Sequence, residues 1–147
     1  MSHFVECRTE FKDPQALVEA LVECGFGREH IEVHAQPAAL YGYHGDVRPQ
    51  KANVVIRRQH VGQGANDVGW ERQPDGAYCA WISEFDAGVG AYAQRAKDAR
   101  FNKDMQNRVR QEYAYQVIAR QQRGLGRTVE RQRLASGELE VVIGGYR

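Results

Sequence analysis

Three potential metal ligands alternate along the segment His30-Ile31-Glu32-Val33-His34. Alternate residues of a strand share a face and lie about 6.6–6.8 Å apart. Neighbouring ligands could therefore share an ion, whereas the outer two could not without a bend. The spacing differs from the helical HExxH of zinc proteases, and no cysteine lies nearby in the sequence. We expect a solvated strand face here and predict no metal and no cofactor.

The candidate nucleophiles are three cysteines, Cys7, Cys24 and Cys79. They lack the CxxC spacing of redox and metal motifs, and an odd number without a signal sequence is typical of a reducing compartment. Cys24 and Cys79 fall within apolar helix and strand patterns, which predicts buried structural thiols. His3 or His60 could meet one of them in space, but no nucleophile elbow or family signature accompanies any of them. The sequence therefore favours a protein that is not an enzyme.

Basic residues are concentrated between residues 95 and 127, where nine bases accompany three acids. The candidates for contacts with nucleic-acid phosphates are Arg100, Lys103, Arg108 and Arg110. On a helical wheel, however, the bases scatter around the polar side, whereas a helix that reads a groove concentrates them in one stripe. A solvated face is the simpler interpretation. Nucleic-acid binding by the basic helical face at residues 95–123 is the alternative function, with a steep salt dependence.

Aromatic residues beside glycines indicate a candidate surface for a protein partner. Two tyrosines lie within Leu40-Tyr41-Gly42-Tyr43-His44-Gly45, and a tryptophan ends Asn66-Asp67-Val68-Gly69-Trp70. Glycine lets a backbone approach closely while neighbouring rings cover a ligand or partner. A hairpin that caps the core is the plain alternative. The predicted partner-binding residues are Tyr41, Tyr43, His44, Trp70 and Tyr115.

Tyr115 lies about 160° around the predicted helix from the centre of the apolar face to which Tyr113 belongs. An outward aromatic residue usually packs beneath a loop or a strand, and it can also anchor an interface. In the interface role, Tyr115→Ala should weaken partner binding with nearly unchanged thermal stability. A large fall in melting temperature would instead identify a core residue.

The elements that position these residues begin with a strand and a helix. Residues 3–11 alternate with a period of two and predict a strand. Asp13-Pro14 predicts a helix start, because aspartate accepts a hydrogen bond from a free N–H and proline fits the first helical position. The apolar residues that follow fall on one helical face, and Gly25 provides a left-handed residue that ends the helix.

Strands and helical segments alternate along the rest of the chain. Strands are predicted at residues 30–34, 53–56, 68–72 and 78–82, with an irregular segment or loose hairpin over residues 36–50. Residues 89–123 predict two helices, the first with Tyr92 and Ala96 and the second capped by Asn102. A hairpin of residues 128–134 and 138–143 closes the chain. Together these elements predict one α+β domain over residues 1–147, a mainly antiparallel sheet with helices on one face. A ferredoxin-like plait is the nearest named arrangement.

The overall composition is that of an ordinary globular protein, with 42% hydrophobic residues. A net charge of +1 by itself predicts neither a nucleic-acid nor a membrane partner. No stretch approaches the roughly 20 apolar residues of a membrane span, and the N-terminus lacks a basic region followed by an apolar run. We expect a cytoplasmic protein, or a stromal one if the host has plastids.

Several motifs, taken in order, resemble one known family. They are Ser2-His3-Phe4, the helix at residues 13–25, Tyr41-Gly42-Tyr43-His44-Gly45, Asp67-Val68-Gly69-Trp70 and Gln111-Glu112-Tyr113-Ala114-Tyr115. Their order and spacing over nearly the whole chain resemble the hypothetical chloroplast reading frame thirty-five family, small proteins of plastids, cyanobacteria, other bacteria and phages. That family has no assigned biochemical role and offers no catalytic residues to carry over.

The resemblance also implies a partner. Bacterial members similar to this chain are often encoded near an ATPase of the AAA class, which implies a small adaptor or regulatory subunit of a ring ATPase. We therefore predict a non-enzymatic adaptor or regulatory subunit that acts through protein–protein contacts. The suspected partner is an AAA-class ATPase.

Overall fold

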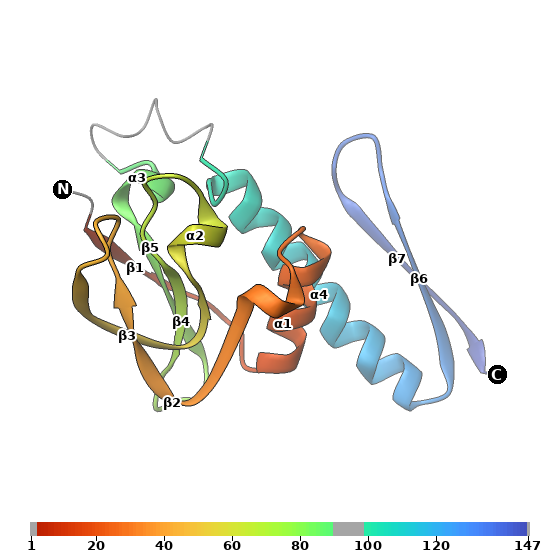
Figure 1. Ribbon diagram of the computed structural model, residues 1–147. Coiled ribbons are helices and arrows are strands. Elements are labelled where there is room, and N and C mark those ends of the chain that lie inside the picture. Colours follow the sequence, from red (N-terminus) through yellow and green to blue (C-terminus); the bar gives the residue numbers. More distant parts are fainter. Residues whose placement is uncertain (1–2, 90–98, 147) are drawn as a thin grey trace.

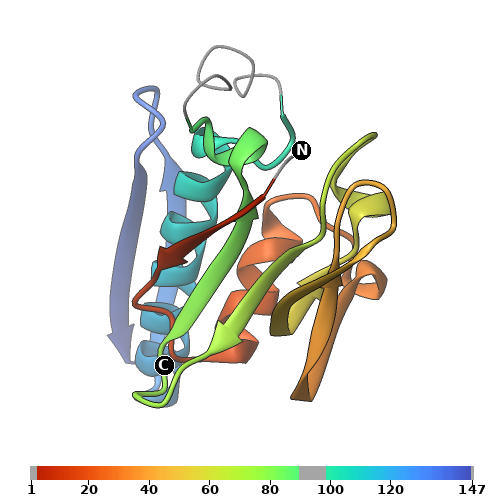
Figure 2. The same ribbon diagram turned by 90° about the vertical axis from the view of Figure 1, so that its left-hand side faces the viewer.

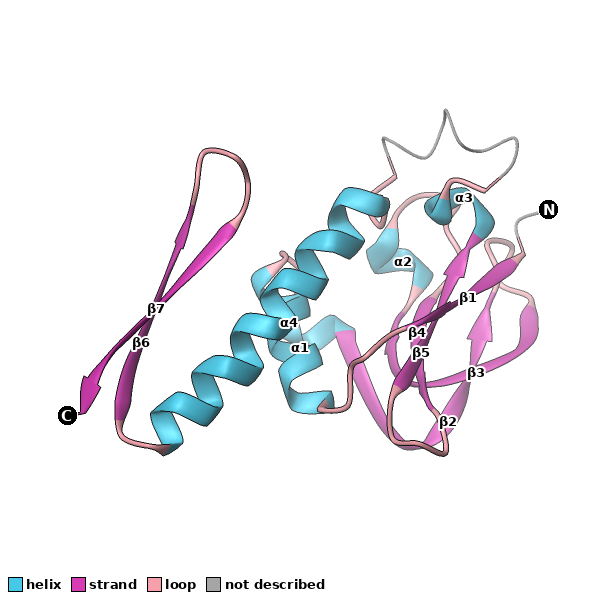
Figure 3. Ribbon diagram, turned by 180° about the vertical axis from the view of Figure 1, so that it is seen from behind, coloured by secondary structure: helices cyan, strands magenta, loops and turns pink. Residues whose placement is uncertain are grey.

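A sheet, a pair of helices and a hairpin form three layers in the computed structural model, which describes residues 3–89 and 99–146 (Figure 1). The large sheet contains β1 (Phe4–Arg8), β2 (Ile31–Tyr41), β3 (Val47–Ile56), β4 (Val68–Arg72) and β5 (Tyr78–Ser83). The helices are α1 (Pro14–Glu23), α2 (Arg58–Val61), α3 (Glu84–Ala87) and α4 (Lys103–Gly124), and a 3₁₀ turn (Arg28–His30) precedes β2. The closing hairpin consists of β6 (Arg127–Arg133) and β7 (Leu139–Tyr146). Figure 3 shows α1 and α4 between the large sheet and this hairpin.

All strand pairings among the described residues are antiparallel, and the order in the large sheet is β1-β5-β4-β3-β2. Strands β2 to β5 form a meander, and β1 pairs with β5, so β1 and β2 are the two edges. The predicted α+β class with a mainly antiparallel sheet is confirmed. The strand order differs from that of a ferredoxin-like plait, whose βαββαβ chain places the first strand inside the sheet.

Helix α1 begins and ends where the sequence predicts. Asp13 Oδ1 accepts hydrogen bonds from the backbone N–H groups of Gln15 and Ala16 at 3.0 and 3.3 Å. These bonds satisfy donors that the first helical turn leaves free. Gly25 follows the helix with a φ of +101°, in the region that favours glycine, and lets the chain turn towards β2.

The main core lies between the helices and one face of the sheet. Its members include Leu17 and Leu21 of α1, Val54, Ile56, Val68, Trp70 and Ile82 of the sheet, and Phe101 and Val109 from the region of α4. The Trp70 and Phe101 rings meet edge to face, with centroids 5.7 Å apart. Burial of each large apolar side chain contributes roughly 1.5–3 kcal/mol. This core therefore determines where α4 crosses the sheet.

A second side of α4 is covered by the closing hairpin. Tyr115 and Ala119 of the helix pack against Val129 of β6, with Leu139 and Val141 of β7 beside them. An aromatic residue far from the main apolar face of the helix was expected to pack beneath a strand or a loop, and the hairpin provides those strands. The structure thus gives α4 two buried sides.

The opposite face of the large sheet is covered by the bent end of the β2–β3 hairpin. Register irregularities between Val33 and Ala38 and between Ala39 and Tyr41 accompany the bend. Leu40 then packs with Ala52 and Val55, and Phe4 and Trp81 lie beside them. A Cβ atom at Gly69 would lie 2.6 Å from Ala52 Cβ and 2.9 Å from Leu40 Cδ2. Glycine is therefore required for this close approach.

Part of the predicted helical region cannot be compared with the structure. The first predicted helix, with Tyr92 and Ala96, lies outside the described residues, as do Arg95 and Lys97. The second predicted helix is confirmed as α4. Asn102 Oδ1 accepts a hydrogen bond from the Met105 N–H at 2.9 Å, and α4 begins at Lys103, directly after Asn102. Within residues 3–89 and 99–146, no helix is long and apolar enough to cross a membrane.

Candidate partner-binding cleft

A cleft of about 810 Å³ opens between β1 and α4. One wall consists of residues 7–12, and the other consists of α4 residues between Gln106 and Ile118. The floor is formed by core side chains: Trp70, Ala80, Ile82, Phe101 and Val109. Figure 2 shows β1 at the near edge of the sheet, beside α4. A concave, mostly apolar site with a few polar groups is the usual form of a binding site.

Tyr113 fixes one end of the cleft. Its hydroxyl oxygen accepts hydrogen bonds from the backbone N–H groups of Lys12 and Asp13 at 2.8 and 2.9 Å. Its ring lies against Phe11, with centroids 4.3 Å apart. Because these contacts join α4 directly to the segment that follows β1, they hold the two walls in a defined position. The cleft is therefore preformed in the folded chain.

Positive charge predominates at the rim of the cleft. Arg8, Lys12 and Arg110 line it together with Glu10, and all four are exposed. Among the described residues, none of these three cations forms an ion pair. Charges that line a cleft of low dielectric raise the local concentration of oppositely charged groups. The rim thus favours an acidic ligand.

The thiol in the cleft is not activated as a nucleophile. Burial raises the pKa of Cys7, and Glu6 raises it further. Burial also raises the pKa of Cys24 to about 11 and that of Cys79 to about 12. Because the thiolate is the reactive form of cysteine, all three are held as thiols at neutral pH. Cys7 therefore supplies no thiolate to the cleft at neutral pH.

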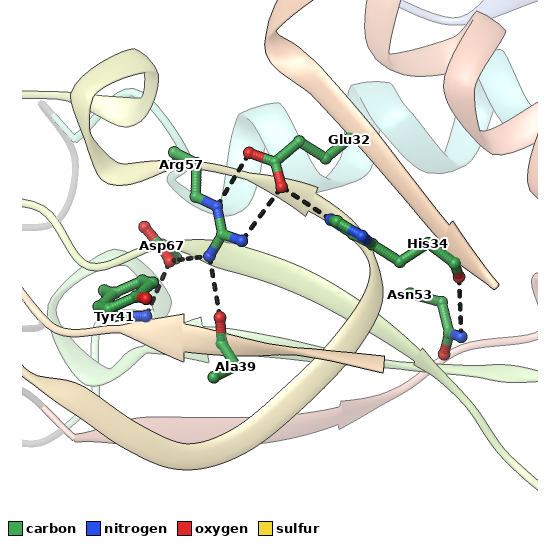
Figure 4. Close-up of polar contacts among 7 residues, drawn as sticks. All are labelled: Glu32, His34, Ala39, Tyr41, Asn53, Arg57 and Asp67. Carbon is green, nitrogen blue, oxygen red and sulfur yellow. Dashed lines mark hydrogen bonds and ion pairs between the residues drawn. The ribbon is translucent and has the colours of Figure 1, made fainter. Parts of the chain in front are cut away.

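A set of polar contacts on the bent hairpin, the Arg57 clamp, consists of Glu32, Arg57 and Asp67 (Figure 4). Arg57 Nε and Nη2 donate to the Glu32 carboxylate at 2.9 and 3.1 Å. Arg57 Nη1 donates to Asp67 Oδ2 at 3.0 Å and to the carbonyl oxygen of Ala39 at 2.9 Å. The planar guanidinium suits this bidentate geometry. The clamp joins the start of β2, the end of β3 and the start of β4.

Asp67 brings two of the sequence motifs together. Its carboxylate accepts hydrogen bonds from the backbone N–H groups of Tyr41 and Arg58 at 2.8 and 2.7 Å. Its own N–H donates to the Tyr41 carbonyl at 2.9 Å, and the Asn66 side chain accepts from the Tyr43 N–H at 2.8 Å. The Asn66-Asp67 pair therefore holds the hairpin tip on the start of β4, which is a structural role.

The histidines and glutamate of residues 30–34 are engaged in contacts within the chain. Glu32 Oε1 lies 2.7 Å from His34 Nε2. Burial raises the pKa of Glu32, but hydrogen bonds with Arg57 and His34 outweigh this effect, and the pKa is lowered overall. His30 stacks on His60, with ring centroids 3.6 Å apart. In the part of the chain that the structure describes, no group of three histidine, cysteine, aspartate or glutamate side chains is placed to hold a metal ion.

The five predicted partner-binding residues do not form one surface. Tyr41 and His44 are exposed and Tyr43 is half-buried at the hairpin tip. Trp70 is 2% exposed and contributes only to the floor of the cleft, and Tyr115 is 7% exposed beneath the closing hairpin. Neither ring is available on the surface, which corrects the prediction for these two residues. Each is buried because it fills the space between two layers.

Sequence reasoning missed the cleft because its two walls are far apart along the chain. The one sequence signal is Val117, which the helical wheel assigns to the apolar face of α4. In the structure Val117 lines the cleft and is 38% exposed. An apolar side chain that the core leaves partly open indicates where the helix meets the cleft.

The candidate nucleic-acid residues point to different parts of the molecule. Arg110 lines the cleft. Arg108 instead lies near Cys24, the residue that follows α1, where its charge partly offsets the rise that burial causes in the pKa of that thiol. Arg100 donates to the carbonyl oxygens of His60 and Gly25 at 2.5 and 3.0 Å. Lys103 is exposed in the first turn of α4. These residues therefore do not form a single basic stripe.

Comparison with known proteins identifies the family. The family described as "Protein of unknown function (DUF1257)" matches residues 28–142, which is more than half of the chain. The chain belongs to the DUF1257 family. In this DUF1257 protein the matched residues include the Arg57 clamp, Gly69 and the helical wall of the cleft, whereas β1 and α1 precede them. No curated protein and no solved structure matches the chain.

Proposed function

We propose that this DUF1257 protein is an adaptor or regulatory subunit that acts through protein–protein contacts and binds a segment of its partner in the cleft between β1 and α4. The observation that carries the proposal is the cleft itself, in which an apolar floor opens beside an edge strand. An apolar patch surrounded by a polar rim is typical of protein interaction sites.

The preformed walls support this role. The contacts of Tyr113 with Phe11, Lys12 and Asp13 fix the position of α4 relative to the segment that follows β1 before a partner arrives. A site that is already ordered loses less conformational entropy on binding than a flexible one. The floor and the exposed side chain of Val117 then offer apolar area that binding would remove from water.

The proposed partner is an AAA-class ATPase. This choice rests on the resemblance of the motifs to the hypothetical chloroplast reading frame thirty-five family, and the assignment of the chain to that narrower family is part of the same proposal. The corresponding compartment is the cytoplasm, or the plastid stroma if the host has plastids.

The test is affinity purification of the tagged protein from its native host, at moderate salt and with nuclease, in parallel with Val117→Glu. Val117 lies in the cleft wall and is already partly exposed, so a charge there should block an apolar contact without disturbing the core. The matched control is Val142→Glu, because Val142 is 49% exposed on β7, outside the cleft. We expect one stoichiometric ATPase with the wild type and the control, and its loss with Val117→Glu.

Two outcomes of this purification would overturn the proposal. One is recovery of no protein partner by the wild type. The other is equal recovery of the partner by Val117→Glu and Val142→Glu, which would place the contact elsewhere. Thermal unfolding of both variants checks that each remains folded.

The alternative function, nucleic-acid binding through Arg100, Lys103, Arg108 and Arg110, is favoured by the excess of bases between residues 95 and 127. Each phosphate contact releases counterions, so affinity for a labelled duplex should fall steeply with salt. Reversing the charges of Lys103 and Arg108 by substitution with glutamate should also weaken the affinity for the duplex. Affinity that is insensitive to salt would rule this alternative out.

A further inference from the structure

The outer side of β1 carries unpaired backbone groups beside the cleft. The Glu84 N–H donates to the His3 carbonyl at 2.7 Å, directly before the pair Phe4 and Ser83 in the β1–β5 register. Hydrogen-bonded pairs alternate with non-hydrogen-bonded pairs in an antiparallel ladder. The backbone N–H and C=O groups of Phe4, Glu6 and Arg8 therefore point away from β5. No described strand pairs with that side of β1.

The first wall of the cleft continues beyond β1. Cys7 and Arg8 belong to the strand, and residues 9–12 follow it. The helical wall, residues 106–118, extends about 20 Å at the rise of a helix. An extended segment of about six residues has this length, so a segment that pairs with β1 can continue past Arg8 along α4.

The sides of such a segment would meet different surroundings. Successive side chains of a strand point to opposite faces, so every second side chain would face the apolar floor and Val117. The remaining side chains would point out of the cleft, where Arg8, Lys12 and Arg110 outnumber Glu10. The floor therefore favours apolar residues at alternate positions, and the rim favours acidic residues between them.

We propose that the cleft binds an extended segment of a partner protein, with alternating apolar and acidic residues, that adds as a strand to the open edge of β1. This inference rests on the proposed function and specifies the class of ligand. Strand addition would supply main-chain hydrogen bonds, and the alternating side chains would supply specificity. The acidic residues would neutralise the cations of the rim.

The first test uses defined peptides and the full-length protein. The probe is a fluorescein-labelled octapeptide in which valine and glutamate alternate, and binding is measured by fluorescence polarisation. One control replaces each glutamate by lysine, and another keeps the composition but places valines and glutamates in pairs. We expect the alternating acidic peptide to bind about tenfold more tightly than either control. Equal affinity for all three peptides, or no binding of the acidic one, would overturn the inference.

The second test asks whether the contact is made by the backbone. In one series the valine nitrogens of the probe are methylated, and in the other the glutamate nitrogens are methylated. Because N–H groups of alternate residues point to the same edge of a strand, only one series should lose its affinity. Equal behaviour of the two series would exclude strand addition.

The third test locates the acidic contact. Arg110→Glu should reduce the affinity for the alternating acidic peptide about fivefold, because an exposed attractive charge pair becomes a repulsive one. The control is Arg108→Glu, on the same helix and also exposed, but outside the cleft. Equal losses in the two variants would indicate a general charge effect and contradict the proposed site.

The peptide tests and the purification fail independently. Loss of the cellular partner in Val117→Glu together with absence of peptide binding would retain the proposed function and reject this class of ligand. Peptide binding that Val117→Glu does not weaken would place the peptide outside the cleft and reject this inference, whereas the purification tests the proposed function separately.

Discussion

Asp67→Ala is expected to reduce the free energy of unfolding by about 3–5 kcal/mol, the usual cost of removing one partner of a buried ion pair. The Asp67 carboxylate is buried and accepts hydrogen bonds from Arg57 and from the backbone N–H groups of Tyr41 and Arg58. Each hydrogen bond to a charged group contributes about 1.5–3 kcal/mol. Arg57 is half-buried and retains its contact with Glu32, so the total stays below the sum of the separate bonds.

The assay is urea unfolding followed by the fluorescence of Trp70 and Trp81, both of which belong to the large sheet. For a chain of this length the loss corresponds to a fall in melting temperature of roughly 10–16 °C. The control is Asp75→Ala, because Asp75 is exposed in a turn and accepts a hydrogen bond from the Ala77 N–H at 2.9 Å. That variant should lose less than about 1 kcal/mol.

Two results would refute this account of the Arg57 clamp. The first is an Asp67→Ala loss no larger than that of Asp75→Ala. The second is additivity of Asp67→Ala with Arg57→Met. Because the two side chains are in direct contact, the double variant should lose about 1–3 kcal/mol less than the sum of the single losses. Faster amide hydrogen exchange at Tyr41 and Tyr43 would show that the hairpin tip has been released.

Three further predictions concern other parts of the fold. Asp86 is 3% exposed, and burial raises the pKa of its carboxyl group from 3.8 to about 6. Because the folded protein favours the protonated form, the stability that this form supplies is fully present below about pH 4. It is lost as the pH rises through 6. Asp86→Asn should therefore be more stable than the wild type at pH 7, by up to about 3 kcal/mol, with no difference at pH 4 in urea unfolding; an equal gain at both pH values would contradict this. Gly69→Ala should lower the free energy of unfolding by about 1–3 kcal/mol, because the added methyl group overpacks the hairpin. Gly124→Ala is the control and should not destabilise the protein, because a Cβ atom there meets no neighbour. Equal denaturation midpoints for the two variants would count against the close packing of the hairpin. Tyr115→Ala should cost about 3 kcal/mol, and Tyr115→Phe should cost less than about 1 kcal/mol because the ring still fills the space beneath the closing hairpin. Loss of partner capture by Tyr115→Ala with an unchanged melting temperature would restore its role as an interface anchor.

Local patterns in the sequence were sufficient for several elements of the fold. The Asp13 cap, the left-handed Gly25 and the Asn102 cap all depend on contacts within a few residues, and each lies at the predicted helix boundary. The β4–β5 hairpin and the closing hairpin were predicted for the same reason, because short turns join strands that are adjacent in the sequence. The segment over residues 36–50, rich in glycine and proline, was predicted as an irregular segment or a loose hairpin. The structure has a hairpin there, in which β2 continues to Tyr41, β3 begins at Val47 and the register is interrupted twice.

The candidate site was much less predictable. Tyr41, Gly69 and Asp67 were recognised as members of notable motifs, but their common role depends on the bent hairpin, which brings residues 41 and 67 together. Trp70 and Tyr115 were predicted to contact a partner. That prediction failed because residue type alone does not distinguish a buried ring from an exposed one. Only the packing of layers on both sides makes them core residues.

The sequence by itself determined the α+β class, the boundaries of α1 and α4 and the hairpins, because these depend on hydrogen bonds and apolar periodicity over short distances along the chain. The tertiary structure alone decided the strand order, the two buried sides of α4 and the cleft beside β1. The walls of that cleft meet through contacts such as Lys12 with Tyr113, whose positions differ by 101 residues. No local pattern records which distant residues will pack together, because that choice minimises the free energy of the whole chain.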